Sequence, residues 1–321
     1  MSICFRRREF ITALAATAGW PVAARAQGDR VRRVAAVMPA ATTTPQRVAV
    51  LREELQKLGW REGRNLRLDV RTAGDAALQV AAEEVVMSAP EVIFANTGPV
   101  ARVVQTRTRT IPIVFTGGGD PVESGLVSNI ARPGGNTTGF ANIFATLGGK
   151  YLELLKETVP RVTRVAILSN PDRGGGRGLI ASVESAAAPL GTMTVRTPFR
   201  NSAEIESAIE SFAAEPNGAL ILVGPIPAEF ETIGRSALKQ RLPLTYQITG
   251  EGVLISYAPD PSDLVRGAAS YIDRILRGAK PGELPVQFPT TFQLVINLKT
   301  AKALGLTVPP AILLRADEVI E

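Results

Sequence analysis

The chain of 321 residues contains no histidine and a single cysteine, Cys4. Histidine is the commonest general base and the commonest transition-metal ligand, so its absence excludes most metal sites and many catalytic centres. Zinc, copper or iron would have to be bound by carboxylates alone, which these metals seldom use. We therefore expect no metal ion and no cofactor, and we expect that the protein is not an enzyme.

Two nucleotide- and acyl-handling motifs are also missing. The sequence has neither a GxxxxGK[ST] phosphate loop nor a G-x-S-x-G nucleophile turn. The glycine runs 117–119 and 174–176 lack those spacings, and we interpret them as flexible turns. Carboxylate pairs or a Ser-Lys pair can still catalyse reactions, but the sequence offers no convincing nucleophile with a base.

Aromatic residues make up only 5% of the chain, and only two of them are tryptophans. Trp20 lies in the N-terminal segment, which leaves Trp60, in a turn at the end of a predicted helix. Carbohydrate-binding sites use flat aromatic surfaces, so this scarcity disfavours a sugar ligand.

The first 26 residues are typical of an export signal. Arg6, Arg7 and Arg8 precede an apolar run that closes with Ala24-Arg25-Ala26, the order of basic end, apolar middle and small-residue cleavage site. We expect cleavage near Ala26-Gln27 and a location in the periplasm. The Arg7-Arg8 pair resembles the twin-arginine type of signal, but Arg6 stands where Ser or Thr is usual, so either export route remains open. The run is too short for a membrane span.

Removal of residues 1–26 changes the composition of the chain. Cys4 is lost, so no internal disulfide can form, and the absence of a cysteine at the cleavage point argues against a lipid anchor. The segment holds four arginines and one glutamate, so the formal net charge falls from +6 to +3. The remaining Lys and Arg are scattered among acids, and we expect no nucleic-acid partner.

The rest of the chain alternates short apolar runs with helical patterns, which indicates βαβ units with parallel sheets. The chain without its signal has about 295 residues, more than a single hydrophobic core usually holds. We therefore predict two doubly wound, Rossmann-like α/β lobes. The predicted strands are 34–38, 66–70, 91–95, 111–115, 164–168, 192–198, 218–224, 242–246, 253–257 and 292–296.

The two halves of the chain resemble each other. The strand that begins at Val34 matches the one at Val165, and Pro112 aligns with Pro243, both at an offset of 131 residues. A third pair, Pro99 and Pro225, aligns at an offset of 126 residues. Three matching pairs at nearly the same offset favour two lobes of the same architecture.

Three segments carry a resemblance to a known family: Ile111 to Gly139, Gly149 to Leu155, and Asn297 to Leu306. Together they resemble the periplasmic substrate-binding proteins of ABC importers, in the family that includes tryptophan- and tyrosine-type amino-acid binders. The resemblance extends from about Arg33 to Glu321. It implies a type I periplasmic-binding fold, with three hinge crossings and a ligand clamped between the lobes.

From this resemblance and the periodicity we predict how the chain divides. Residues 31–146 plus about 251–284 form the N-terminal lobe, and residues 147–250 plus about 285–321 form the C-terminal lobe. Asn136 and Thr137 are interpreted as hinge or loop residues, because the chain approaches its first crossing there.

Ligands of open α/β sheets bind beyond the carboxyl ends of the strands, where helix N-termini offer unpaired N–H groups. Each candidate has a structural alternative: a helix cap for the two acids, which we favour over ligand contact, a turn for Thr97 and Asn170, and core packing for Tyr246. The predicted ligand-binding residues are Thr97, Gly98, Asp120, Asn170, Tyr246 and Asp260.

These observations predict a solute-binding component of an ABC importer. It clamps an amino acid or another small carboxylate between its lobes and delivers it to a permease in the inner membrane, and we expect a monomer. The alternatives are a ligand-sensing partner of a membrane receptor and, less favoured, a periplasmic enzyme on the same fold. A cytoplasmic repressor is disfavoured, because an export signal stands where its DNA-binding module would be.

Overall fold

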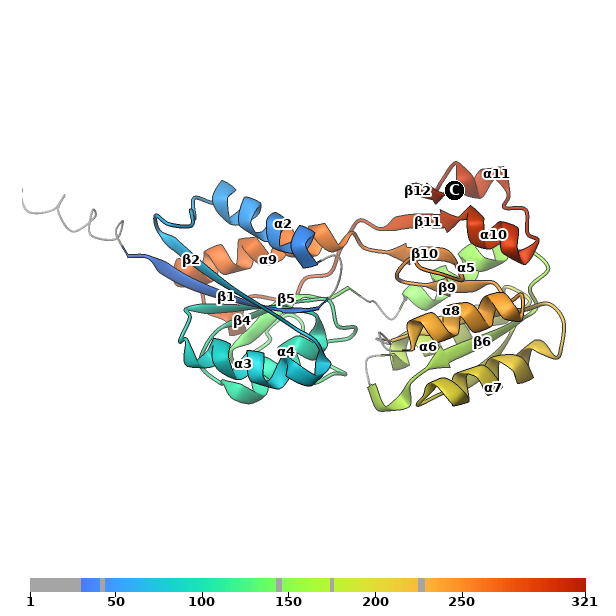
Figure 1. The fold of residues 1–321 in the computed structure, drawn as a ribbon, viewed down its shortest axis with the longest axis horizontal. Coiled ribbons are helices and arrows are strands. Elements are labelled where there is room, and N and C mark those ends of the chain that lie inside the picture. The colour runs from blue at the N-terminus through green and yellow to red at the C-terminus, as the bar shows by residue number, and fades with distance from the viewer. Residues whose placement is uncertain (1–29, 41–43, 143–145, 174–175, 225–228) are drawn as a thin grey trace, which may run out of the picture.

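A computed structural model describes residues 30–40, 44–142, 146–173, 176–224 and 229–321 of the chain. Figure 1 shows two α/β lobes lying side by side, each built on its own sheet. The predicted export signal, with Cys4 and the cleavage point, lies outside the described residues, as do Gly174, Gly175 and Pro225.

The sheet of the first lobe has five parallel strands in the order β2-β1-β3-β4-β5. Its three central strands are buried almost throughout, as expected for a parallel sheet covered on both faces. The strands are β1 (Arg32–Pro39), β2 (Leu66–Ala73), β3 (Val92–Asn96), β4 (Ile113–Thr116) and β5 (Thr137–Phe140).

The sheet of the second lobe has seven strands in the order β12-β11-β10-β9-β8-β6-β7. The pairs from β6 to β10 are parallel, whereas β11 runs antiparallel to β10. The strands are β6 (Arg164–Ser169), β7 (Met193–Pro198), β8 (Gly218–Val223), β9 (Leu244–Tyr246), β10 (Val253–Ala258), β11 (Gln293–Asn297) and β12 (Glu318–Ile320).

Helices connect the strands, and some begin at an asparagine cap, a residue type that is favoured at helix N-termini. Asn201 and Asn297 accept hydrogen bonds from the backbone N–H groups of Glu204 and Thr300, each at 3.0 Å. The helices are α2 (Thr44–Lys57), α3 (Leu78–Met87), α4 (Gly98–Arg107), α5 (Leu147–Thr158), α6 (Arg177–Ala187), α7 (Ser202–Ala213), α8 (Phe230–Lys239), α9 (Pro261–Leu276), α10 (Leu298–Leu304) and α11 (Pro310–Leu313), with short 3₁₀ turns η1 (Asp75–Ala77), η2 (Pro171–Arg173) and η3 (Pro281–Glu283). Among the described residues, no helix combines the length and the apolar character that crossing a membrane requires.

The two sheets share one topology. The order β2-β1-β3-β4-β5 of the first sheet is repeated by β7-β6-β8-β9-β10 in the second, to which β11 and β12 are added. β1 and β6 contain the sequence pair Val34 and Val165, and β4 and β9 follow Pro112 and Pro243. The expectation of two lobes with the same doubly wound architecture is therefore confirmed.

The lobes exchange one helix each. α5 follows β5 of the first sheet but packs against α6, β9 and β10 of the second lobe. In the same way, α9 follows β10 of the second sheet but packs against α2, β3, β4 and β5 of the first lobe. A third connection leads from the first lobe to β11, so the chain passes between the sheets three times (Figure 1).

This exchange corrects the predicted place of residues 251–284. β10 lies in the second sheet, between β9 and β11, and only the chain from α9 onward lies with the first lobe. The reason is topological, because β10 occupies in the second sheet the position that β5 occupies in the first. The segment after residue 284 also differs from expectation, since Val286 packs in the core of the first lobe and Gln287 pairs with Phe140 of β5.

The predicted hinge or loop at Asn136 and Thr137 is partly wrong. Thr137 begins β5, an edge strand paired in parallel with β4. Asn136 lies just before it and holds the strand in place, because its Nδ2 donates to the carbonyl oxygen of Ile111 at 2.8 Å. The chain begins its crossing only after Phe140.

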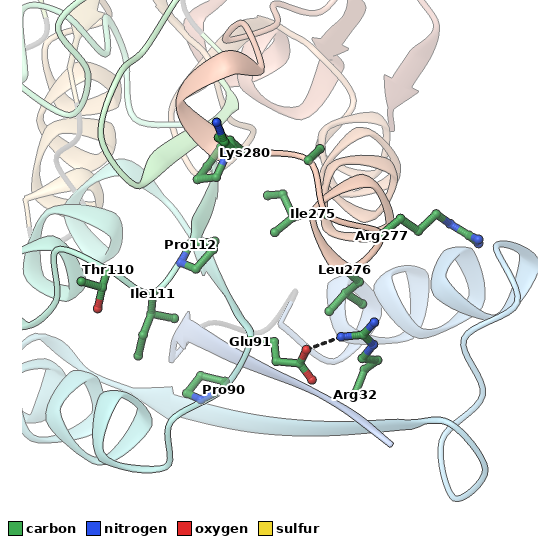
Figure 2. A pocket seen from close by; sticks show the side chains of 13 residues that line it. Arg32, Pro90, Glu91, Thr110, Ile111, Pro112, Ile275, Leu276, Arg277 and Lys280 are labelled. Atoms are coloured by element: carbon green, nitrogen blue, oxygen red, sulfur yellow. Dashed lines mark hydrogen bonds and ion pairs between the residues drawn. The ribbon is translucent and has the colours of Figure 1, made fainter. Parts of the chain in front are cut away.

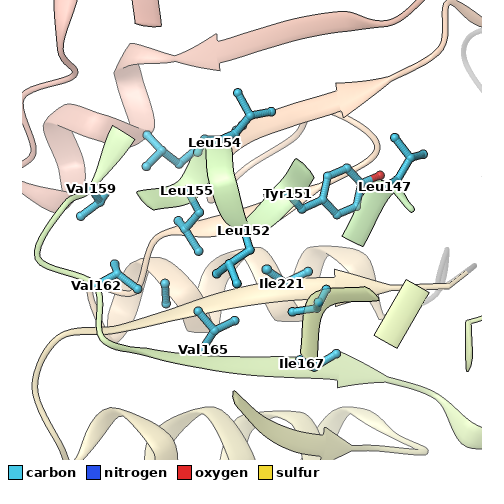
Figure 3. Close-up of a cluster of buried hydrophobic side chains, with 14 of the residues drawn as sticks. Leu147, Tyr151, Leu152, Leu154, Leu155, Val159, Val162, Val165, Ile167 and Ile221 are labelled. Carbon is cyan, nitrogen blue, oxygen red and sulfur yellow. The ribbon is translucent and has the colours of Figure 1, made fainter. Parts of the chain in front are cut away.

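The core of the second lobe explains why α5 lies there. Its buried residues Leu147, Tyr151, Leu155 and Thr158 recur at intervals of three or four, which places them on one face of the helix. Figure 3 shows this face packed over the strands that carry Val165, Ile167 and Ile221. Each fully buried leucine of this kind contributes about 1.5–3 kcal/mol relative to an exposed one.

Candidate functional site

The two lobes contact each other near the carboxyl ends of their strands. Asn142 lies two residues after β5, and its Nδ2 donates to Oε1 of Gln247, the residue after β9, at 3.4 Å. An ion pair also joins the lobes, because Nε of Arg177 at the start of α6 lies 3.4 Å from Oε1 of Glu123. Since ligands of open α/β sheets bind beyond these strand ends, the facing carboxyl edges form the candidate site.

A depression lies at the opposite end of the first lobe. It has a volume of about 570 Å³ and is lined by residues at the start of β1, before β3 and β4, and at and after the end of α9 (Figure 2). Its charged residues already pair within the chain: Arg32 with Glu91 at 2.5 Å, Arg277 with Asp273 at 2.6 Å, and Lys280 with Glu283 at 3.4 Å. No charge is left over there to orient a ligand, so this depression is a weak candidate.

Thr97 occupies the junction between β3 and α4. Its Oγ1 accepts from the backbone N–H of Val100 at 3.5 Å, so it caps α4, whereas the structural alternative expected for this residue was a turn. Its backbone adopts φ 108° and ψ 150°, a region that is unfavourable for a β-branched residue. Such strain costs about 1–3 kcal/mol and concentrates at ligand sites, which makes Thr97 a stronger candidate than its sequence alone indicates.

Gly98 brings two segments of backbone into direct contact. A Cβ atom at this position would lie 2.6 Å from Cα of Gly118, so no other residue fits without a shift of the chain. Gly117, Gly118 and Gly119 all have positive φ, and the amide oxygen of Asn142 accepts from the N–H of Gly119 at 3.2 Å. This glycine run is therefore a turn packed against the start of α4 and not only a flexible connection.

Asp120 and Asp260 are both caps. Oδ1 of Asp120 accepts from the N–H groups of Val122 and Glu123 at 2.8 and 3.0 Å, although the turn that it caps does not continue into a helix. Oδ1 of Asp260 accepts from the N–H of Ser262 at the start of α9, and its Oδ2 lies 3.2 Å from Arg266. The second oxygen of Asp120 has no such contact within the described residues.

Asn170 and Tyr246 also serve the chain itself. Oδ1 of Asn170 accepts from the N–H of Asp172 at 3.0 Å, which is the Asx-type turn expected before Pro171. Tyr246 is buried, its hydroxyl donates to the carbonyl oxygen of Gly224 at 2.8 Å, and its ring lies 5.6 Å from that of Phe230. Both residues stand at strand ends as predicted, and the structure supplies the packing explanation for Tyr246.

Arg47 and Asn96 form a contact that the sequence analysis missed. Arg47 lies in the first turn of α2, is half-buried, and donates through Nη1 to Oδ1 of Asn96 at 3.3 Å. Burial lowers the pKa of Arg47, and no carboxylate lies within ion-pair distance among the described residues. Asn96 lies between the predicted strand 91–95 and the candidate Thr97, but no local signal marks Arg47, which lies 49 residues earlier.

Three further residues at the same edges escaped the sequence analysis. Asn142 and Gln247 were not singled out, because amides in loops carry no pattern of their own. Glu229, a carboxylate only 6% exposed, precedes α8 at the carboxyl side of β8. Amides and buried charges of this kind are what an orienting site for a small polar molecule requires.

Within the described ranges, no group of three or more carboxylate or other ligating side chains is arranged to hold a metal ion. The arrangement offers hydrogen-bond donors, one half-buried guanidinium and carboxylates, placed on two lobes that are joined by crossings. Its chemistry is that of recognition of a polar solute.

This fold, with two sheets of one topology and three crossings between them, is that of the type I periplasmic-binding proteins. The chain belongs to the family of ABC transporter substrate-binding proteins, whose sequence model matches residues 41–320. Proteins of this family bind small-molecule solutes and work with ABC transporter permeases.

The relatives include proteins with named ligands. The chain is 26% identical over 261 residues to the tyrosine-binding protein of Clostridioides difficile, a match that covers 78% of this chain and 74% of the relative. A crystal structure of a conserved domain protein from Vibrio cholerae has 29% identity and a TM-score of 0.79, over 90% of this chain and 100% of that one. An ABC domain from Streptococcus pneumonia in complex with L-Trp has 22% identity and a TM-score of 0.79, with the same coverage.

Proposed function

We propose that this protein is the extracytoplasmic solute-binding component of an ABC importer. It captures an amino acid or another small carboxylate between its lobes and delivers it to a membrane permease. The observation that carries the proposal is the contact between the carboxyl edges of two sheets with one topology, made by Asn142 and Gln247. A solute held there touches both lobes, and its binding energy favours the closed arrangement.

The amino-acid class is supported by the chemistry of these edges. The start of α4 offers N–H groups and partial positive charge to a carboxylate, and Glu229 and Asp120 offer negative charge to an ammonium. The relatives named for tyrosine and for L-Trp agree with this class.

The proposed ligand contacts begin with Thr97, Gly98 and Asp120. Thr97 holds a strained backbone at the site, Gly98 lets the chain approach closely, and Asp120 keeps one carboxylate oxygen without a contact in the described chain. Asn170, Tyr246 and Asp260 are proposed to shape the edge, because their polar groups are engaged with neighbouring backbone or side chains.

The proposal includes export to the periplasm as a monomer. It rests on residues 1–26 of the sequence, with the signal cleaved near Ala26-Gln27, by the twin-arginine or the general route. No cofactor and no catalytic step are part of the proposal. N-terminal sequencing of the exported protein tests the cleavage point, and replacement of Arg7 and Arg8 by Lys tests the route.

Isothermal titration calorimetry tests the ligand class. The chain from Gln27 is partly unfolded, dialysed to remove any carried ligand and refolded, and is then titrated with amino acids, organic acids and neutral sugars. We expect saturable one-to-one binding of at least one amino acid and none of the sugars. Absence of binding across all amino acids and organic acids would refute the ligand class.

The role in transport needs a separate test, because a sensor that docks on a membrane receptor has the same binding chemistry. Genes for a permease and an ATPase beside its own support import. Deletion of the gene is expected to abolish uptake of the labelled ligand identified by calorimetry. Normal uptake, with loss of a response to the ligand, would instead indicate a sensing partner.

A further inference from the structure

Arg47 is an unusual arginine for this chain. Two other partly buried arginines face an acid: Arg32, whose side chain is 27% exposed, pairs with Glu91, and Arg164, 15% exposed, pairs with Glu215 at 3.3 Å. Arg33 instead donates to the carbonyl oxygen of Ser88 at the other end of β1, away from the carboxyl edge. Arg47 is half-buried, and among the described residues its one polar partner is the neutral amide of Asn96. Partial removal of a charge from water without a counter-charge is costly, and this favours a charged partner from outside the chain.

The position of Arg47 indicates where that partner comes from. α2 follows β1, so its first turn lies at the carboxyl edge of the first sheet, at the end of α2 nearest the second lobe (Figure 1). Asn96 is the last residue of β3, the strand paired with β1, and leads directly into Thr97 and α4. The guanidinium therefore lies at the edge where the solute is proposed to bind.

Asn96 supplies a second, independent observation. It is only 3% exposed, its Oδ1 accepts from Arg47, and its Nδ2 has no hydrogen-bond partner within the described residues. Native proteins leave few buried donors unsatisfied, and an unsatisfied one at a site marks a place where an acceptor is missing. Both groups at this spot are donors, so the missing partner is an acceptor with negative charge.

We propose that Arg47 is the anchor for the carboxylate of the solute, and that Asn96 is the positioning residue that holds its guanidinium. This inference rests on the proposed function, in that it assumes the solute binds at the carboxyl edges. It goes further by assigning the side chain that binds the carboxylate and the side chain that positions it. A planar guanidinium binds a carboxylate through two parallel hydrogen bonds, which a lysine cannot reproduce.

Calorimetry with matched variants and matched probes tests the inference. The variants are Arg47→Gln and Arg47→Lys, with Arg52→Gln as the control, because Arg52 lies on the same helix but pairs with Glu62 on the exposed side. The probes are L-tyrosine and L-tryptophan, with L-tyrosinamide as the analogue that keeps the ammonium and lacks the carboxylate. Succinate and other organic acids complete the panel.

We expect Arg47→Gln to weaken acid binding about 30- to 100-fold, Arg47→Lys to restore part of it, and Arg52→Gln to leave it unchanged. L-Tyrosinamide is expected to bind weakly, and equally to the wild type and to Arg47→Gln. If Arg47→Gln binds tyrosine with the affinity of the wild type, the role of Arg47 is overturned, while the proposed function stays intact.

A second variant guards against loss of folding. Asn96→Asp preserves the shape of the side chain and places a carboxylate at hydrogen-bond distance from Arg47. We expect it to raise the melting temperature of the ligand-free protein and to weaken acid binding, because the internal carboxylate competes with that of the ligand. If no amino acid binds but an organic acid does so in an Arg47-dependent way, the amino-acid class fails and the anchor stands. If no carboxylate in the panel shows Arg47-dependent binding, the inference is wrong.

Discussion

The side chain of Asn142 in the first lobe reaches Gln247 in the second, with 3.4 Å between its Nδ2 and Oε1 of Gln247. The same Asn142 accepts from the N–H of Gly119, so it connects the glycine turn of the first lobe to the strand end of the second. The contact lies just beyond β5 and β9, where a solute between the lobes would have to be accommodated. The distance between these two side chains therefore depends on the relative position of the lobes.

Closure of the lobes is the first prediction. Spin labels at Val80→Cys in α3 and Ala203→Cys in α7 lie in different lobes, along the same side of the molecule (Figure 1). Addition of the ligand is expected to shorten the distance between them, as measured by pulsed electron resonance. In the chain from Gln27 no native cysteine competes for the label. The pair Ala203→Cys and Leu314→Cys, both in the second lobe, is expected to show no change.

The close approach of Gly98 and Gly118 gives the second prediction. Gly98→Ala places a Cβ 2.6 Å from Cα of Gly118, so we expect a loss of about 1–3 kcal/mol in the free energy of unfolding. It is also expected to weaken ligand binding, because the start of α4 shifts. Urea denaturation and calorimetry measure the two effects. Gly74→Ala is the control, since its Cβ meets nothing within 4 Å, and a similar loss there would show that the contact at Gly98 is not the cause.

The roles of the two predicted acids, Asp120 and Asp260, are distinguished by replacing each with asparagine, which removes the charge. Asp120→Asn and Asp260→Asn both keep an oxygen for the cap, so each is expected to change stability by less than about 0.5 kcal/mol. We expect Asp120→Asn to weaken the binding of an amino acid about tenfold and not that of its deaminated analogue, because an ammonium contact is lost. Asp260→Asn is expected to bind as the wild type does, since its Oδ2 faces Arg266. The reverse pattern would exchange the roles of the two residues.

Tyr151 gives a pH prediction. Its ring lies on the buried face of α5, and burial, with smaller contributions from Tyr246 and Tyr257, raises the pKa of its hydroxyl above the usual 10. Above pH 10 the unfolded chain releases this proton while the folded chain retains it, so the unfolded state gains stability as the pH rises. The urea midpoint of the wild type should therefore fall more steeply above pH 10 than that of Tyr151→Phe. Parallel curves for the two proteins would contradict this explanation.

Much of the fold could be predicted because the parallel strands are buried on both faces and appear as continuous apolar runs. The runs at Val34 and Val165 begin equivalent strands, and the caps Asn201 and Asn297 stand where helices α7 and α10 begin. β5 was missed, since Thr137–Phe140 contains two threonines and a glycine and lacks the apolar character of the other strands.

The candidate site could be predicted only in part. Thr97 and Gly98 could be predicted from their place after a strand and before a helix. Arg47 could not be found in this way, because its significance comes from a contact with Asn96, which is 49 residues away in the chain. It also comes from the lack of a carboxylate within ion-pair distance among the described residues. Asp120 and Asp260 each precede a proline, so their local sequences do not distinguish them. Only the contacts of their second carboxylate oxygens do so.

The sequence by itself determined the α/β alternation, the two similar halves and the strand ends at which polar residues gather, because each depends on residues close together in the chain. The tertiary structure alone decided that β10 completes the second sheet, that α5 and α9 are exchanged between the lobes, and that Gly98 lies against Gly118. These features depend on which sheet edge and which apolar face remain uncovered once the other elements have packed. No local pattern contains that information, since it is a property of the whole assembled core.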